Sequence, residues 1–312
     1  MAKITMKSLF EAGVHLGHKT ERWHPEMKPF IYGSKAGIYI IDIRQTLAKL
    51  QEAYEYVYNM SANGGRVLFV GTKFQARDVM AEQAKKSDNY FVNLRWLGGM
   101  LTNFQTVKQS ITKLKNFDTA AGPEGTYPGI LKKEASKMEK DRKKLEAVLG
   151  GIADMRKVPS VIFVIDIKKE EIAIQEAKRL NIPVVAIVDT NCDPRNVDIV
   201  IPGNDDSIHS IELFTEVIAQ ASIDGKKAFD AKNMSSESAK RTETRSSAPK
   251  AKPSNPSKPF VRTEASKTVA PKAITKPAIV EAPKAEAKPA VVEAPKAEEV
   301  KAATPAPVEK SE

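Results

Sequence analysis

The sequence predicts an α/β domain built on a parallel sheet, because continuous apolar runs alternate with segments of helical periodicity. The strand signal is strongest in Val67–Val70, Val161–Ile165 and Val184–Val188, which are rich in β-branched residues. Runs without polar alternation indicate strands that are covered on both faces, as in parallel sheets. Two shorter runs complete the expected sheet: Ile38–Ile41 and Val197–Ile201.

Segments with helical spacing lie between these strands. Apolar residues recur every three or four positions within residues 47–57, 172–180 and 208–218. Strand and helix therefore alternate along the chain, which predicts a doubly wound sheet with right-handed crossovers.

The interval 103–150 interrupts this alternation. Its first half has four apolar residues at helical spacing: Phe104, Val107, Ile111 and Leu114. Glycines and prolines follow within residues 122–129, and apolar spacing resumes between Leu131 and Leu149. The pattern predicts an antiparallel coiled-coil hairpin inserted into the α/β domain. Arg142 stands where the heptad needs an apolar residue, so we expect the seam to be short or imperfect.

Residues 226–312 contain almost no large apolar side chains and are rich in Ala, Lys, Pro, Ser and Glu. Such a segment cannot bury enough apolar surface to offset its conformational entropy, so we expect it to be disordered. The expected organisation is an α/β domain formed by residues 1–102 and 151–225, an inserted hairpin at 103–150 and a disordered tail at 226–312.

The net charge of +10 is distributed unevenly. Residues 1–157 contain 26 basic and 16 acidic side chains, whereas residues 158–225 contain 5 and 12. A positive field attracts polyanions and favours nucleic acid as a partner. We find neither a bilayer-length apolar run nor a secretory signal, so we expect cytoplasmic localisation and no membrane partner. Cys192 is the only cysteine, which excludes an intrachain disulfide.

Residues 12–32 gather three of the four histidines, several cations and three aromatic side chains in a stretch that we expect to be a loop. We interpret it as an RNA contact, in which Trp23 would stack on bases or sugars and cations would bind phosphates. The cations assigned to this role are Lys19, Arg22, Lys28 and Lys35. Two alternatives stay open: metal ligation by the histidines, and an arm whose aromatic rings pack on the domain.

Further donors for RNA lie in two turns and on the hairpin. Lys73 ends a Gly-Thr-Lys turn between a strand and a helix, where backbone amides also hold phosphates. Neither a G-x-G-x-x-G nor a Walker A pattern is present, so we expect no nucleotide cofactor. Arg95 and Trp96 precede Gly98–Gly99, which alternatively forms only a tight turn at the hairpin base. The hairpin lysines assigned to phosphates are Lys108, Lys113, Lys132, Lys133, Lys143 and Lys144.

An oxygen-rich cluster is expected where parallel strands end. Asp189 terminates an expected strand, and Asp193 and Asp205 are expected to lie close to it. These carboxylates predict a structural divalent cation, either magnesium or zinc with a histidine, although no cofactor is required for the expected function. The alternative is helix capping and turn formation by the same residues.

Several motifs resemble the bacterial ribosomal protein S2 family of the small subunit, in the same order along the chain. They are Ala12-Gly-Val-His-Leu-Gly-His18, Met27-Lys-Pro-Phe-Ile31, Phe69-Val-Gly-Thr-Lys73, Arg95-Trp-Leu-Gly-Gly-Met-Leu-Thr-Asn103, Ile187-Val-Asp-Thr-Asn191 and Val200-Ile-Pro-Gly-Asn-Asp-Asp206. The resemblance covers about residues 4–225. Phe74–Gln75 departs from the basic run that often follows in relatives, which weakens a phosphate role for the preceding turn.

The resemblance implies a flavodoxin-like or Rossmann-like domain with a coiled-coil insertion, located between the head and body of the small subunit. It also implies contact with small-subunit ribosomal RNA and with neighbouring ribosomal proteins, including the OB-repeat protein that captures messenger RNA. The leading hypothesis is therefore a non-catalytic ribosomal component. The rival is a metal-dependent enzyme acting on a phosphorylated substrate at the strand ends, for which the segment offers only Thr190 and Cys192 as nucleophiles.

Overall fold

The computed structural model describes residues 4–121, 127 and 131–246, with side chains described up to residue 234. Its centre is a parallel sheet, as the sequence predicts, with five strands in the order β5-β4-β6-β7-β8. The strands are β4 (Val67–Val70), β5 (Tyr90–Val92), β6 (Val161–Ile165), β7 (Val184–Val188) and β8 (Ile199–Pro202). The three-residue β5 was not predicted, because so short a run has no usable periodicity.

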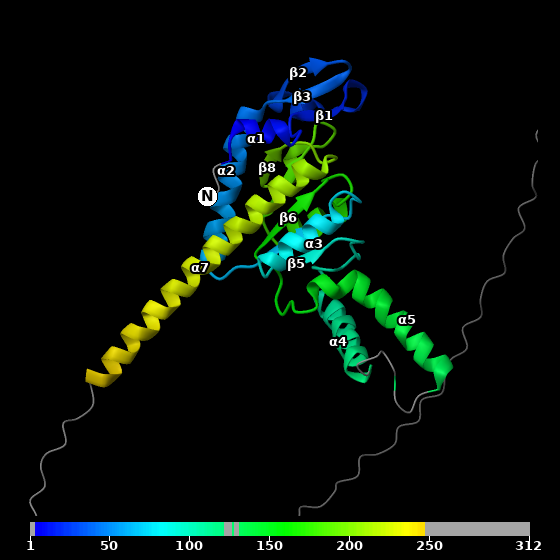
Figure 1. Cartoon of the computed structure of the whole chain (residues 1–312), viewed down its shortest axis with the longest axis vertical. Helices are drawn as coiled ribbons and strands as arrows, with labels where there is room; N and C mark the ends of the chain where they lie inside the picture. Colours follow the sequence, from blue (N-terminus) through cyan, green and yellow to red (C-terminus); the bar gives the residue numbers. More distant parts are fainter. Residues whose placement is uncertain (1–3, 122–126, 128–130, 247–312) are drawn as a thin grey trace, which may run out of the picture. The chain divides into compact units, whose positions relative to one another are not determined.

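Helices cover both faces of this sheet, which confirms the α/β class and fits a Rossmann-like fold (Figure 1). One face packs against α2 (Ile43–Ala62), α3 (Arg77–Lys86) and α7 (Ile208–Ser246), and the other against α6 (Glu171–Arg179). Successive side chains of a strand point to opposite faces. Phe69 therefore packs edge-on against Phe163 in one core, while Leu68 and Ile162 enter the other.

The run Ile38–Ile41 does not belong to the parallel sheet, which corrects the expected strand set. It forms β3 of a separate antiparallel sheet, ordered β1-β3-β2, with β1 (Leu16–Lys19) and β2 (Ile31–Lys35). Residues 12–32, which the sequence predicts to be a loop, are therefore largely ordered. We call residues 12–41, which contain this antiparallel sheet, the arm. Ala36 and Gly37, at the turn between β2 and β3, both have positive φ, as a two-residue hairpin turn requires. An Ala-Gly pair lacks the Asn-Gly signature that would have revealed this hairpin.

The interval 103–150 contains two helices, α4 (Phe104–Ala120) and α5 (Lys132–Leu149), which pack against each other. Arg142 replaces an apolar contact by an ion pair, because its guanidinium lies 3.2 Å from Asp118 on α4 and 2.9 Å from Glu146 on its own helix. The coiled-coil geometry stays a prediction. Most of the expected connection, residues 122–126 and 128–130, lies outside the described residues.

The disorder expected from residue 226 onward is contradicted for residues 226–246, because α7 continues to Ser246. Lys226, the first residue of that expected tail, forms a 2.6 Å ion pair with Asp88. Alanine, lysine and glutamate are good helix formers, so a segment that lacks large apolar residues still extends an anchored helix. The remainder of the predicted tail, residues 247–312, lies outside the described residues. No helix of the part described is both long and apolar enough to cross a membrane.

Candidate RNA interface and polar cluster

Polar side chains converge at the carboxyl ends of the parallel strands, as they do in other open α/β sheets. Lys73 follows β4, Asp166 follows β6, Asp189 follows β7 and Asp205 follows β8. The ammonium nitrogen of Lys73 lies 2.9 Å from Asp205 and 3.7 Å from Asp166. Its third partner is the exposed Asp206, at 2.6 Å. Lys73 therefore offsets part of the charge of an acidic cluster, and its side chain is not free to hold a phosphate as predicted.

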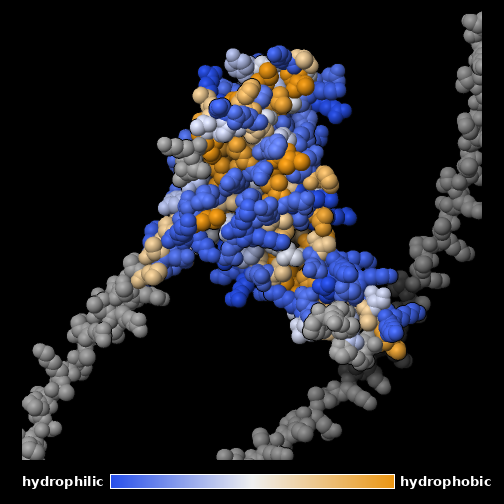
Figure 2. Space-filling view, viewed as in Figure 1, coloured by the Kyte–Doolittle hydropathy of each residue, from blue (hydrophilic) through white to orange (hydrophobic). Residues whose placement is uncertain are grey.

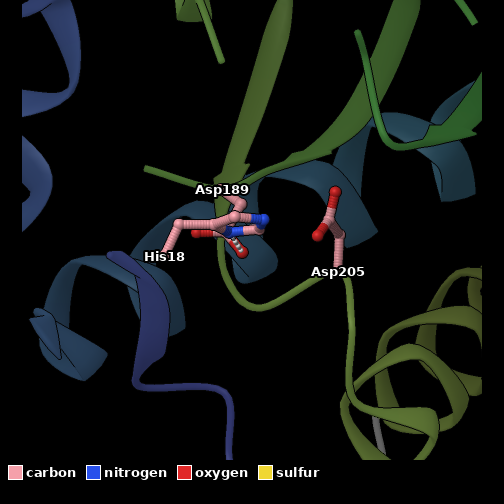
Figure 3. Close-up of side chains that lie close together, drawn as sticks. All are labelled: His18, Asp189 and Asp205. Carbon is pink, nitrogen blue, oxygen red and sulfur yellow. Dashed lines mark hydrogen bonds and ion pairs between the residues drawn. The ribbon is translucent and has the colours of Figure 1, made fainter. Parts of the chain in front are cut away.

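The antiparallel arm contributes a histidine to this cluster. Nδ1 of His18 lies 2.9 Å from a carboxylate oxygen of Asp189, and the two side chains face Asp205 in Figure 3. The backbone fixes the arm here, since the His18 amide donates to the hydroxyl of Thr190 at 2.9 Å. Gly17 makes this approach feasible, because a Cβ at that position would lie 2.7 Å from the Thr190 methyl carbon.

Burial and charge shift the pKa values in the cluster. Burial raises the pKa of Asp205 to about 7, and the neighbouring Asp189 carboxylate acts in the same direction while Lys73 opposes it. The hydrogen bond to Asp189 raises the pKa of His18 above its usual value against the opposing effect of burial. Burial alone would lower the pKa of Lys73, but the carboxylates of Asp205 and Asp206 raise it. The cluster thus combines cations with an excess of acidic oxygens.

The donor atoms of His18, Asp189 and Asp205 all lie within 4.8 Å of one another. One carboxylate oxygen of Asp205 is buried without a hydrogen-bond partner. One imidazole and two carboxylates are ligand types that zinc accepts, whereas magnesium favours oxygen ligands alone. The residues therefore fit a metal ion. Asp193, however, is outside this group: it pairs with Arg195 at 3.1 Å and caps the short 3-10 helix Pro194–Asn196, so its predicted ligand role is corrected.

The two nucleophiles considered for the rival enzyme hypothesis are both buried. Burial raises the pKa of Cys192 to about 12, so its thiol stays protonated near neutral pH. The Thr190 hydroxyl is occupied by the His18 amide and by Asp189. Neither group is poised for attack.

The cations predicted for the early segment all lie on the surface of the arm. Lys19, Arg22, Lys28 and Lys35 are exposed, and none of them forms an ion pair with a described residue. Trp23 is 36% exposed, and its ring lies 5.5 Å from that of Tyr39 in a tilted arrangement. The arm therefore displays cations without ion-pair partners among the described residues, together with the partly exposed ring of Trp23, which packs against Tyr39.

Arg95 and Trp96, the second cation–aromatic pair predicted to contact RNA, lie in different environments in the structure. Arg95 is exposed, whereas Trp96 is only 8% exposed. The indole nitrogen of Trp96 donates to the buried carboxylate of Glu176 at 3.0 Å. Gly99 has a φ of +85° and donates its amide to the same carboxylate at 2.8 Å. Trp96 is thus part of the tight turn at the hairpin base, and its predicted role as a stacking surface for RNA is corrected.

The hairpin displays its predicted lysines to solvent. The six are exposed: Lys108, Lys113, Lys132, Lys133, Lys143 and Lys144. Only Lys143 among them forms an ion pair with a described residue, at 3.5 Å from Glu139. On the face shown in Figure 2, the surface over α3 and α5 is mostly hydrophilic.

Comparison with known proteins decides the family. A family model described as ribosomal protein S2 matches residues 9–225. The chain belongs to the ribosomal protein S2 family. A protein of Geotalea uraniireducens called small ribosomal subunit protein uS2 is 56% identical over 232 residues, which are 74% of this chain and 90% of the relative. A protein of the same name from Desulforapulum autotrophicum is 53% identical over 229 residues, 73% and 81% of the two chains.

Within this S2-family domain, Glu176 is the main structural residue that sequence reasoning missed. Its carboxylate also accepts from the amides of Leu101 and Thr102, each at 3.0 Å. A signal existed, because Glu176 lies between Ala173 and Ala177 on the buried face of α6. A glutamate on such a face indicates a buried carboxylate with specific donors.

Proposed function

We propose that this chain is a non-catalytic structural constituent of the small ribosomal subunit that binds small-subunit ribosomal RNA. The single observation that carries the proposal is the S2-family match across residues 9–225. The proposal includes a position at the junction of head and body, as the family resemblance implies. It also includes contact with neighbouring ribosomal proteins and a part in docking the OB-repeat protein that binds messenger RNA.

The exposed cations support RNA as the partner. Four cations of the arm and five of the six hairpin lysines assigned to phosphates lack ion-pair partners among the described residues. Phosphate contacts of this kind release condensed counterions and are largely independent of base sequence. The arm and the hairpin would therefore position the protein on folded RNA, with Arg95 as a further exposed donor.

Co-sedimentation tests this function. Ribosomes from the native host are washed at moderate salt and separated, and the chain is located by mass spectrometry. We expect it in the small-subunit fraction, cross-linked to ribosomal RNA and to the OB-repeat protein. Recovery only from the soluble fraction would overturn the structural role. Incorporation without any cross-link to the OB-repeat protein would overturn the docking role alone.

We also propose a structural zinc ion held by His18, Asp189 and Asp205. The support is the 4.8 Å cluster of donor atoms and the unpartnered buried oxygen of Asp205. Bound zinc would stabilise the folded chain by an amount that grows with the logarithm of the zinc concentration once that exceeds the dissociation constant. We expect zinc, but not magnesium, to raise the Tm of the full chain, and His18→Ala to abolish this rise while Asp193→Asn preserves it. An equal zinc response in His18→Ala would refute the site.

A further inference from the structure

A large cleft opens at the amino ends of the parallel strands, opposite the polar cluster described above. Residues that precede or begin β4, β5 and β6 form one wall, and the bases of α4 and α5 form another. Its volume is about 1140 Å³. Small-molecule pockets usually measure about 300–1,000 Å³, and they bury most of their ligand. This cleft is larger, and its lining is more polar than such a pocket.

Every acidic side chain of the cleft already has a cationic partner. Asp88 pairs with Arg66 at 3.2 Å and with Lys226 at 2.6 Å. Asp154 pairs with Lys115 at 3.2 Å. Glu146 pairs with Arg142 at 2.9 Å. The acidic groups of the lining are therefore neutralised from within the protein.

Four basic side chains of the same lining have no acidic partner among the described residues. They are Lys85 from α3, Lys108 from α4, and Arg156 and Lys157 from the loop before β6. All four are exposed. Since the acidic groups are already paired, these cations leave a net positive potential within a concave surface, where field lines concentrate.

The connection after α5 is held tightly against the sheet, which fixes the wall that carries Arg156 and Lys157. Gly151 lies directly on β5, because a Cβ at this position would collide with the carbonyl oxygen of Phe91. Ile152 and Met155 are buried in the core below the loop. Two of the four cations thus stand on an anchored segment, so little backbone entropy is lost when they bind a ligand.

The aromatic rings of the cleft are covered by cations. The guanidinium of Arg66 lies 5.5 Å from the ring centroid of Tyr90, and the ammonium of Lys85 lies 5.7 Å from that of Phe91. Stacking of bases needs a free ring face. The exposed groups of the cleft are instead ammonium and guanidinium donors, which match phosphate oxygens.

We propose that this cleft binds a phosphodiester segment of small-subunit ribosomal RNA, with Lys85, Lys108, Arg156 and Lys157 as the phosphate donors. The inference rests on the proposed function and specifies a surface for it at the hairpin base. Three of these four residues, all except Lys108, were not predicted from the sequence. Recognition here depends on the sugar-phosphate backbone of the RNA and is insensitive to base identity.

The test measures the salt dependence of binding between the full chain and protein-free small-subunit ribosomal RNA. The cleft variant combines Lys85→Gln, Lys108→Gln, Arg156→Gln and Lys157→Gln. The control variant removes four positive charges outside the cleft by Lys49→Gln, Lys86→Gln, Lys178→Gln and Arg179→Gln. Each lost phosphate contact reduces the slope of log K against log salt by about 0.7–0.9. We expect the cleft variant to lose about 3 from the slope and the control variant to lose little.

The outcomes separate this inference from the broader function. If the wild-type chain does not bind the RNA, the RNA-binding function fails. If it binds and the cleft variant keeps the full slope, only the cleft assignment fails. If the cleft variant does not fold, chemical acetylation of lysines in the wild-type chain decides between the outcomes. We then expect bound RNA to protect Lys85, Lys108 and Lys157 from acetylation but not Lys49. Protection in assembled subunits but not by RNA alone would assign the cleft to a protein neighbour and overturn the proposal.

Discussion

The indole nitrogen of Trp96 donates a 3.0 Å hydrogen bond to the buried carboxylate of Glu176, which lies 80 positions later in the chain. The same carboxylate accepts from three backbone amides and from the Thr102 hydroxyl. One side chain on α6 therefore determines the conformation of the turn that leads into α4. We expect the orientation of the hairpin base to depend on this contact.

Replacement of Glu176 should destabilise the protein strongly. Glu176→Ala leaves the indole and three amides without their acceptor, and each buried unsatisfied group costs roughly 1–3 kcal/mol. We expect the free energy of unfolding to fall by at least about 3 kcal/mol in urea denaturation. Glu171→Ala on the exposed face of the same helix is the matched control and should change it by less than about 0.5 kcal/mol. Equal effects of the two substitutions would contradict the assigned role.

Glu176 should also make stability depend on pH. Burial acts to raise the pKa of Glu176, but hydrogen bonds from Thr102, Trp96 and other donors lower it below its usual value of 4.5. A group with a depressed pKa in the folded state stabilises the protein fully above its unfolded pKa, and this contribution is lost as the pH falls through the folded value. Glu176→Gln cannot titrate, so the loss of stability below about pH 4.5 should be shallower than in the wild type. Parallel curves for the two proteins, measured by urea denaturation from pH 7 to 3, would argue against this account.

Alanine substitutions at Gly151 and Gly150 should change the stability of the protein in opposite directions. A Cβ at Gly151 would collide with the Phe91 carbonyl oxygen, whereas at Gly150 the nearest atom is 3.9 Å away. Overpacking typically costs about 1–3 kcal/mol. Gly150 has helical φ and ψ of −55° and −40°, so alanine there should stabilise by about 0.4–1 kcal/mol. Thermal unfolding of both variants checks this, and a Gly151→Ala protein as stable as the wild type would show that the short 3-10 helix Gly150–Ile152 does not need its close approach to β5.

Neutralising the hairpin should weaken RNA binding without altering sequence preference. The variant combines Lys132→Gln, Lys133→Gln, Lys143→Gln and Lys144→Gln, all at exposed positions. Because phosphates and not base edges are contacted, affinity should fall uniformly for unrelated RNA sequences and the salt slope should flatten. Filter binding at several salt concentrations measures both. Retention of the full slope would reject the hairpin as a phosphate-binding surface.

Arg142 should stabilise the packing between the two hairpin helices. Its guanidinium lies 3.2 Å from Asp118 on α4. Arg142→Leu would restore an apolar residue at the heptad position, whereas Arg142→Ala would remove the contact without replacement. We expect Arg142→Ala to increase hydrogen exchange of the α4 and α5 amides and Arg142→Leu to increase it less. Unchanged exchange in Arg142→Ala would show that the ion pairs contribute nothing to the hairpin.

The sequence alone determined the layered architecture of this protein. Val67–Val70, Val161–Ile165 and Val184–Val188 form adjacent parallel strands because unbroken apolar runs can be buried only between two helical layers. It also predicted the positions of α4 and α5 and the exposure of their lysines, since apolar spacing and charge are local properties of the chain. The early segment and Trp96 were less predictable, because their structure depends on partners distant in sequence.

Only the tertiary structure decided which polar residues meet. Lys73 was predicted to hold phosphate, but it lies among carboxylates that follow other strands of the sheet. Asp193 was grouped with Asp205, yet its side chain turns to Arg195, two residues away. Strand order, arm placement and the pairing of each charge are long-range properties. A carboxylate or ammonium group has the same local signature whether it ends beside a partner or free in a cleft.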